Sequence, residues 1–235
     1  MKFGVNLINF GPGVDPQSLA QWIKESEALG YHLVMTSDHI AVTEDVQSRY
    51  PAPFYEPIST LGWMAGITQN IEIGTTVLIA PYRHILETAK SCATIDQLSE
   101  GRLICGFGVG WASQEYAALG IPFKQRGAIT DEYLEALRIL WSQEVATYQG
   151  KYVSFENIRT APSPFRRFPP IWIGGASDAA LRRTVKFGDA WHPIRIEMDW
   201  FKNIGIPKLN YFAQKEHVTV PRLCPRIKVD LTKGD

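Results

Sequence analysis

The sequence predicts an α/β fold built on parallel strands, and two observations support this prediction. Short runs rich in Val, Ile, Leu and aromatic residues alternate with longer amphipathic segments along most of the 235 residues. The short runs are apolar at successive positions, as expected for parallel strands that helices cover on both faces. The candidate architectures are an open doubly wound sheet and a (β/α)8 barrel, which a single chain of this length can form.

Seven strands are predicted from the apolar runs. They are Phe3–Ile8, Tyr31–Ser37, Ile71–Ala80, Arg102–Gly110, Pro170–Gly175, Ala190–Pro193 and Arg226–Thr232. The first helix begins at Asp15–Pro16, where an N-cap residue precedes a proline, and ends before Gly30. Further helices are predicted where apolar residues recur at helical spacing. These are Ile58–Thr68, Ile85–Leu98, Thr130–Ser142, Asp178–Phe187 and Asp199–Lys215.

Residues 144–169 interrupt the alternation of strands and helices. Tyr148–Phe155 predicts a hairpin around Gly150, and the prolines at 162, 164 and 169 indicate an extended surface segment. We therefore expect one domain over residues 1–235 with a surface insertion at about 144–169.

The composition argues against several classes of protein. The 24 basic residues balance the 24 acidic ones, without the basic excess of most nucleic-acid and anionic-membrane binders. The three cysteines form no CxxC pair, which indicates a reducing compartment. The sequence has neither a signal-peptide pattern nor about 18 consecutive apolar residues. We therefore expect a cytoplasmic protein with no nucleic-acid or membrane partner.

Catalytic motifs of other enzyme classes are absent from the sequence. It contains no GxSxG, HExxH or Walker segment, and its five histidines do not fall at metal-ligand spacing. Neither metal catalysis nor acyl transfer is expected, and no residue is predicted to bind a metal.

Candidate site residues follow the predicted strands, because parallel α/β folds bind ligands at the carboxyl ends of their strands. Asp38–His39 ends the second strand and pairs a carboxylate with an imidazole, which suits proton transfer. In the alternative interpretation, Asp38 caps a turn and His39 is a satisfied polar residue. His192 ends the sixth strand and either lines the pocket or has a structural role.

Two glycine-rich segments also lie at strand ends. The alternate glycines of Gly106–Gly110 let a planar ligand approach the backbone, or else meet the packing needs of a barrel strand. They do not form the dinucleotide fingerprint, because Trp111 stands where its third glycine would be. Gly174–Ser177 precedes a helix and indicates either a phosphate site or a tight turn with Ser177 as N-cap.

Several segments, taken in order over nearly the whole chain, resemble one known family. They are Ala28–Tyr31 with Ser37–His39, Ile73–Leu78, Asp96–Leu103, Gly106–Trp111 with Glu115, Ala118–Phe123, Tyr133–Trp141, Pro170–Ser177 and Gly188–Pro193. Together they resemble the luciferase-like monooxygenase superfamily of (β/α)8 flavin and deazaflavin enzymes. Within it, the chain is most similar to the F420-dependent oxidoreductases.

The resemblance implies roles for the strand-end residues. Asp38 would contact the deazaflavin near its ring or side-chain hydroxyls, and His39 would face the redox carbon. Thr76–Val77 would be the family's non-prolyl cis bond, which backs the ring of the cofactor. The glycine-rich segments would complete the cofactor site: Gly108, Val109 and Gly110 along the ring, and Gly174, Gly175, Ala176 and Ser177 at the phosphate.

One residue departs from part of the family. Members that oxidise sugar phosphates carry a Glu general acid where this chain has Trp111, so we do not expect that substrate class. Trp111 and His192 are then candidates for the wall of the substrate pocket. The expected function is hydride transfer between coenzyme F420 and a small organic substrate, with His39 as the catalytic proton carrier.

Two alternatives remain open at this point. The first is an FMN-dependent monooxygenase, because the superfamily uses one pocket for both cofactors. The second is a non-catalytic cofactor-binding or partner subunit. Members are commonly homodimers, and Trp63, Met64 and Ile67 are candidates for either the dimer interface or the core.

The length bears on the completeness of the expected barrel. The strand predicted at Arg226–Thr232 would be the seventh of eight, so the (β/α)8 barrel is incomplete at the C-terminus as written. Unpaired barrel edges favour aggregation, so we expect a longer natural protein rather than an open barrel that a neighbour completes.

Overall fold

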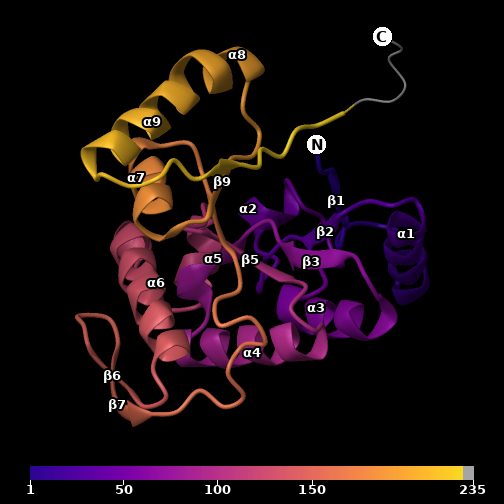
Figure 1. Cartoon of the computed structure of the whole chain (residues 1–235). Helices are drawn as coiled ribbons and strands as arrows, with labels where there is room; N and C mark the ends of the chain where they lie inside the picture. The colour runs from indigo at the N-terminus through magenta and orange to yellow at the C-terminus, as the bar shows by residue number, and fades with distance from the viewer. Residues whose placement is uncertain (230–235) are drawn as a thin grey trace. The chain divides into compact units, whose positions relative to one another are not determined.

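The computed structural model describes residues 1–229 and divides into two compact units, residues 1–170 and residues from 171 onward (Figure 1). In both units, parallel strands alternate with helices, which confirms the predicted α/β class. The prediction of one domain over residues 1–235 stays a prediction. No helix in the described part of the chain is both long and apolar enough to cross a membrane.

A parallel sheet forms the centre of the first unit. Its strands, in spatial order, are β1 (Gly4–Asn6), β2 (Leu33–Thr36), β3 (Glu72–Thr75) and β5 (Leu103–Gly108), and the two-residue β4 (Leu78–Ile79) also pairs with β5. Apolar residues pair across the sheet. Val34 pairs with Val5 on one side and with Ile73 on the other, and Ile73 pairs with Leu103. Val34 and Ile73 are fully buried, as expected for a sheet covered on both faces.

Helices connect the strands of the first unit. They are α1 (Pro16–Ala28), α2 (Glu44–Gln47), α3 (Pro57–Ile67), η1 (Ala80–Tyr82), α4 (Ile85–Leu98), α5 (Ser113–Ala118), η2 (Phe123–Gln125) and α6 (Arg126–Ser142). At the start of α1, Ser18 N–H donates to the Asp15 carboxylate, and Asp15 N–H donates to the Ser18 hydroxyl, so the predicted N-cap is confirmed. The short α2 and α5 were not predicted, because four to six residues are too few to show helical periodicity.

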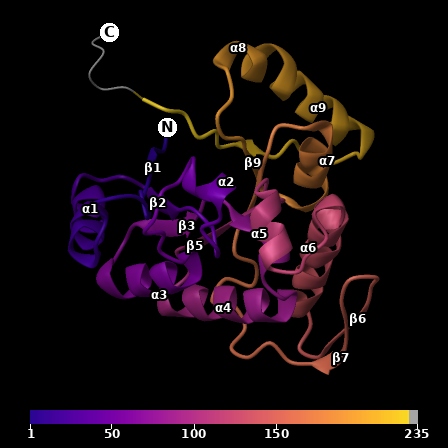
Figure 2. The ribbon, with the colours of Figure 1, turned by 180° about the vertical axis from the view of Figure 1, so that it is seen from behind.

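The predicted hairpin is present beside the lower end of α6 (Figures 1 and 2). It consists of β6 (Ala146–Gln149) and β7 (Ser154–Ile158). The Glu132 carboxylate of α6 accepts backbone N–H groups from Lys151, Tyr152 and Val153 at 2.6–3.0 Å. This carboxylate therefore fixes the hairpin turn to α6.

The second unit repeats the alternation of strands and helices. Its elements are β8 (Ile171–Gly174), α7 (Asp178–Phe187), β9 (Ala190–His192), α8 (Met198–Trp200), the π-helical turn η3 (Phe201–Gly205), α9 (Ile206–Lys215) and β10 (Arg222–Leu223). β9 lies between β8 and β10 in a parallel arrangement. Trp191 of β9, Leu181 of α7 and Leu209 of α9 form a buried core in this unit.

The strand predicted at Arg226–Thr232 is wrong for the described residues. The structure places β10 at Arg222–Leu223, between Pro221 and Pro225, which lack the N–H group that a ladder requires. Arg226 forms an isolated β-bridge with Ile194 and is not part of a strand. Residues 230–232 of the predicted strand lie outside the described part of the chain.

The glycines at the end of β5 make room for the neighbouring segment of the same unit. A Cβ on Gly106 would lie 2.0 Å from the Thr75 carbonyl oxygen, and one on Gly108 would lie 2.4 Å from a methyl group of Val77. Gly110 has a φ of +67° and faces Ile79. This close approach supports the packing interpretation of the alternate glycines.

We predict that Gly106→Ala destabilises the protein, because the new methyl group would meet backbone that cannot move aside. The expected loss is about 2 kcal/mol of unfolding free energy in urea. Gly62→Ala is the matched control, since a Cβ there meets no atom within 4 Å inside α3. The control should be neutral or stabilising by up to about 1 kcal/mol. Equal stability of Gly106→Ala and wild type would contradict the packing assignment.

Candidate functional site

The loops after β1 and β2 are joined by a buried amide. The Asn9 side-chain nitrogen donates to the carbonyls of Ser37 and Tyr55 at 3.0 and 2.7 Å, and its oxygen accepts from Ser37 N–H at 3.1 Å. Asn9 is fully buried. It therefore fixes the backbone at Ser37, directly before Asp38 and His39.

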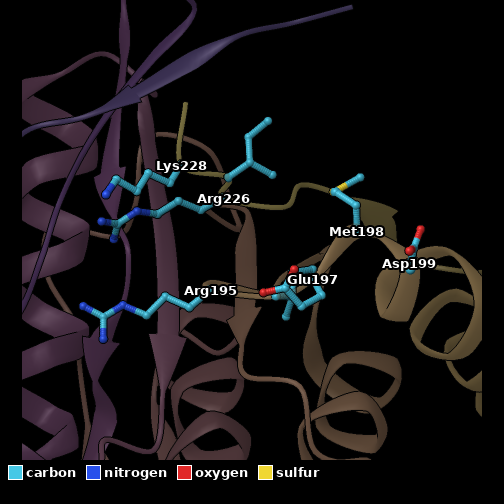
Figure 3. A pocket seen from close by; sticks show the side chains of 8 residues that line it. Arg195, Glu197, Met198, Asp199, Arg226 and Lys228 are labelled. Atoms are coloured by element: carbon cyan, nitrogen blue, oxygen red, sulfur yellow. The ribbon is translucent and has the colours of Figure 1, made fainter. Parts of the chain in front are cut away.

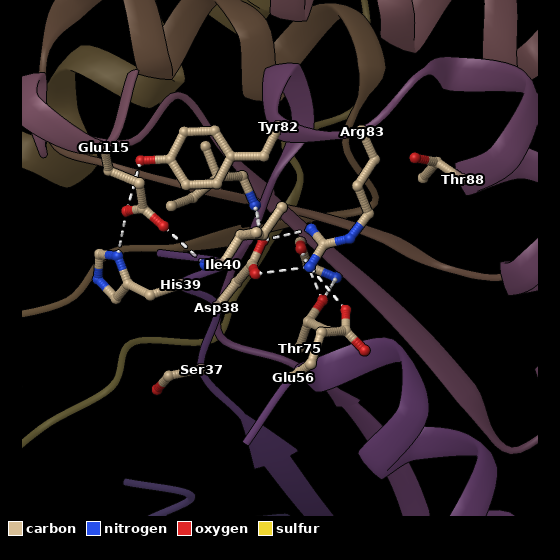
Figure 4. A network of polar contacts seen from close by, with 12 residues as sticks. Ser37, Asp38, His39, Ile40, Glu56, Thr75, Tyr82, Arg83, Thr88 and Glu115 are labelled. Atoms are coloured by element: carbon tan, nitrogen blue, oxygen red, sulfur yellow. Dashed lines mark hydrogen bonds and ion pairs between the residues drawn. The ribbon is translucent and has the colours of Figure 1, made fainter. Parts of the chain in front are cut away.

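His39 contacts a buried carboxylate from a distant part of the chain (Figure 4). Glu115 of α5 lies 2.6 Å from His39 Nδ1 through its Oε2, which also accepts from the Tyr82 hydroxyl at 2.8 Å. Its Oε1 accepts the N–H groups of Ile40 and Ala41 at 2.6 and 3.0 Å. The carboxylate thus joins α5 to the carboxyl end of β2 through three contacts and to η1 through the fourth.

The four donors determine the ionisation of Glu115. Burial alone would raise its pKa, but the contacts with His39, Ala41 and Tyr82 outweigh burial and hold the pKa below its ordinary value. Burial and the negative charge of Glu115 raise the pKa of the Tyr82 hydroxyl, so this hydroxyl keeps its proton. Glu115 is therefore an ionised acceptor at neutral pH.

Aromatic rings surround the imidazole of His39. The ring centroids of Tyr50, Phe54 and Trp111 lie 5.3–5.7 Å from it, and Phe10 stacks on Phe54 at 5.3 Å. The Arg49 guanidinium covers the Trp111 ring at 4.2 Å. Trp111, predicted as a pocket residue, therefore lies beside His39.

Both carboxylate oxygens of Asp38 accept hydrogen bonds from residues of the first unit. Its two oxygens accept a bidentate pair of hydrogen bonds from Arg83 at 2.8 and 2.9 Å, and one of them also accepts Ile79 N–H at 2.8 Å. Arg83 further donates to Glu56 at 2.6 Å. Burial raises the pKa of Asp38 against these contacts, while the charges of Asp38 and Glu56 raise the pKa of Arg83 despite its burial. The predicted contact between Asp38 and a cofactor stays a prediction.

The Thr76–Val77 peptide is cis, as the resemblance implied. It separates β3 from β4, so the strand predicted at Ile71–Ala80 is in fact two strands. Thr76 N–H donates to the Thr36 carbonyl at 2.8 Å, which attaches this bend to β2. Val77 packs over Gly108 of β5, and the predicted contacts of Gly108, Val109 and Gly110 with a cofactor stay predictions.

One polar atom at this end of the first unit lacks a partner. The Thr36 hydroxyl is buried and has no hydrogen-bond partner among the described residues. Buried polar groups are nearly always satisfied, so an unpaired hydroxyl favours an additional molecule at this position. A cofactor rich in ring carbonyls and hydroxyls has the chemistry to meet it.

The second unit holds the remaining predicted residues. Ser177 Oγ accepts Ala180 N–H at 3.2 Å, so Ser177 is the N-cap of α7. The segment from Gly174 to Ala176 leads into this cap, and Gly175 has a φ of +101°, which only glycine adopts readily. The Gly175 carbonyl accepts from the Trp191 indole at 2.8 Å. These contacts fix the shape of the turn, and phosphate binding by it stays a prediction.

His192 is buried at the end of β9. Its Nδ1 lies 2.6 Å from the Cys224 carbonyl, and its ring lies 5.4 Å from the Trp172 ring. Burial lowers the pKa of His192 to about 4, so the imidazole is neutral at pH 7 and donates its Nδ1–H to Cys224. This bond supports the structural alternative for His192.

An open pocket of about 550 Å³ lies beyond β9 in the second unit (Figure 3). The head groups of Arg195, Arg226 and Lys228 extend to the same side in this view, away from Glu197 and Asp199. The sequence did not predict any of these residues as part of a binding site. They come from two separate segments, 195–199 and 226–228, which the parallel bridge between Ile194 and Arg226 brings together. No motif in the sequence connects the two segments.

The sequence also did not single out Glu115, Tyr82 and Arg83 as site residues. Glu115 is 76 residues from His39, and Arg83 is 45 residues from Asp38. No local spacing connects residues so far apart. Tyr82 and Arg83 lie between β4 and α4, and Glu115 lies in the first turn of α5, within a segment that carries the family resemblance.

Comparisons with known proteins give one family. The profile described as luciferase-like monooxygenase matches residues 1–217. The uncharacterized protein Rv0953c of Mycobacterium tuberculosis is 28% identical over 204 residues, covering 81% of this chain and 71% of the relative. An FMNH(2)-dependent dimethylsulfone monooxygenase of Pseudomonas fluorescens is 29% identical over 171 residues, covering 71% of this chain but 44% of that enzyme.

A solved structure shows the same fold. It is an F420-dependent secondary alcohol dehydrogenase in complex with an F420–acetone adduct, with a TM-score of 0.82 and 19% identity. The match covers 95% of this chain and 68% of the solved one. This likeness confirms the predicted fold class, that of the luciferase-like barrels.

The buried neutral His192 predicts a pH dependence of stability. Its folded pKa of about 4 lies below the ordinary 6.5, so the unfolded chain takes up the proton first as the pH falls. The contribution of His192 to the free energy of unfolding is therefore greatest above pH 6.5. It falls progressively toward pH 4, by up to about 3 kcal/mol in all. In His192→Gln the urea midpoint of unfolding should change less between pH 6.5 and pH 4 than in wild type. In His217→Gln, at an exposed site, the midpoint should depend on pH as in wild type. An unchanged slope in His192→Gln would refute this assignment.

Proposed function

The chain belongs to the luciferase-like monooxygenase family, and on this premise we propose that it is an F420-dependent oxidoreductase in which His39 carries the proton. The family is one of oxidoreductases. The choice of F420 and the role of His39 are the proposal.

The observation that supports this proposal most directly is the environment of His39. The imidazole lies at the carboxyl end of β2, where parallel α/β folds bind their ligands, and only 5% of it is exposed. Aromatic rings border it, and a carboxylate holds one of its nitrogens. Imidazole exchanges protons near neutral pH, and the aromatic surroundings limit competing exchange with water.

Bound coenzyme F420 would supply a two-electron hydride carrier. We propose that the Thr36 hydroxyl and the Thr76–Val77 bend of the first unit hold its ring. The unpaired Thr36 hydroxyl supports a bound cofactor of this type, and the similarity to the F420-dependent alcohol dehydrogenase supports F420.

His39 would transfer the proton that accompanies the hydride. During oxidation of an alcohol, the neutral imidazole accepts the hydroxyl proton as the carbon loses its hydride. During reduction of a carbonyl, the imidazolium returns this proton to the oxygen. Trp111 forms part of the wall beside the reacting atoms, where sugar-phosphate oxidising members have an acid.

A second candidate is an FMN-dependent monooxygenase, which the similarity to the dimethylsulfone enzyme supports. The two candidates differ in their use of oxygen. An FMN monooxygenase consumes oxygen with each turnover, whereas an F420 enzyme transfers hydride without it. Binding of neither cofactor would favour a third candidate, a non-catalytic partner subunit.

The test is a titration of the purified protein with F420 and with FMN, followed by absorbance and fluorescence. We expect saturable binding of F420, and turnover of a panel of alcohols and ketones without oxygen consumption. Tight FMN binding with oxygen uptake would favour the second candidate.

We predict that His39→Gln retains cofactor binding within about threefold and loses at least about 100-fold in turnover, the usual contribution of a general acid–base group. The exposed His32→Gln is the control and should behave as wild type. Unchanged turnover of His39→Gln at unchanged cofactor affinity would show that another group carries the proton.

A further inference from the structure

The Glu115 carboxylate receives as many hydrogen bonds as its geometry allows. Each oxygen has two contacts: Oε1 with Ile40 N–H and Ala41 N–H, and Oε2 with Tyr82 Oη and His39 Nδ1. Glu115 is completely buried, so no water competes for these positions. An ionised carboxylate can only accept, and therefore the proton of the 2.6 Å contact lies on His39 Nδ1.

We propose that Glu115 is a positioning residue that fixes the tautomer of His39, so that Nε2 is the nitrogen that exchanges the proton with the substrate. The inference rests on the proposed function for its chemical meaning. The tautomer itself depends only on the contacts described above. A carboxylate that holds one nitrogen of a histidine sets its orientation and leaves the other nitrogen to react.

The contact with Glu115 suits both protonation states of the His39 ring. When Nε2 takes up a proton, the resulting imidazolium lies against an anion 2.6 Å away that compensates its charge. When the ring is neutral, the same contact keeps Nε2 unprotonated and ready to accept. Both protonation states of a proton carrier therefore have a suitable partner.

Because two backbone N–H groups donate to Glu115 Oε1, replacing the other carboxylate oxygen by an amide nitrogen should change the tautomer of His39. The N–H groups of Ile40 and Ala41 cannot become acceptors, so in Glu115→Gln the amide oxygen must remain at the Oε1 position. The amide nitrogen then takes the Oε2 position and donates one hydrogen to His39 Nδ1 and the other to Tyr82 Oη. The Tyr82 hydroxyl then accepts instead of donating, so its own proton loses the Glu115 acceptor, and the proton of the neutral imidazole moves to Nε2.

The experiment is long-range ¹H–¹⁵N NMR of protein labelled at histidine, with the His39 signals assigned by their loss in His39→Gln. In wild type we expect the neutral ring to be protonated at Nδ1 and unprotonated at Nε2. In Glu115→Gln we expect the reverse. Protonation at Nε2 in the wild-type protein would overturn the proposal, even if the variant failed to fold.

Turnover provides the second readout. We predict that Glu115→Gln lowers kcat by about 10²- to 10⁴-fold with little change in KM, since the wrong tautomer presents a proton where an acceptor is needed. Glu132→Gln is the matched control, because Glu132 also accepts several backbone N–H groups, but at the β6–β7 hairpin. It should retain the wild-type tautomer of His39 and the wild-type kcat.

The outcomes separate this inference from the proposed function. A reversed tautomer in Glu115→Gln together with undiminished turnover of His39→Gln would uphold the positioning by Glu115 and reject His39 as the proton carrier. An unchanged tautomer in Glu115→Gln with inactive His39→Gln would reject the positioning and uphold the proton carrier.

Discussion

The ionised Glu115 carboxylate is the constraint on which the end of the first unit depends. Taking a carboxylate out of water costs several kcal/mol, and only well-placed donors offset this cost. The donors are His39, the two residues that follow it and Tyr82 of η1, while Glu115 itself comes from α5. If α5 moved, an uncompensated charge would remain buried, so the position of α5 and the conformation at His39 are determined together.

A second charged group constrains the neighbouring strand end. Arg83 connects Asp38, which follows β2, with Glu56, which precedes α3. Asp38 in turn accepts Ile79 N–H from β4, directly beyond the cis peptide. The strand ends near the proposed reaction centre are thus held by ionic contacts, while apolar packing holds the middle of the sheet.

The sequence predicted elements with strong periodicity well. Helices α4 and α7 have the predicted bounds, because their apolar residues recur at helical spacing and clear end signals follow. The position of His39 at a strand end was also predictable. The partners of Asp38 and His39 were not, because a sequence of residue types does not reveal which distant side chains meet. For the same reason, the glycines of β5 allowed two interpretations until Thr75 and Val77 were placed against them.

The segment between His39 and α3 is fixed at both of its ends. Glu115 holds Ile40 and Ala41, and at the other end Asn9 holds the Tyr55 carbonyl while Arg83 holds Glu56. The residues between these anchors, 42–54, contribute Tyr50 and Phe54 to the surroundings of His39. This stretch is accordingly a natural unit for exchange by protein engineering: a replacement that keeps an apolar residue in the buried place of Val46 can present new side chains to a substrate while the chemistry stays in place.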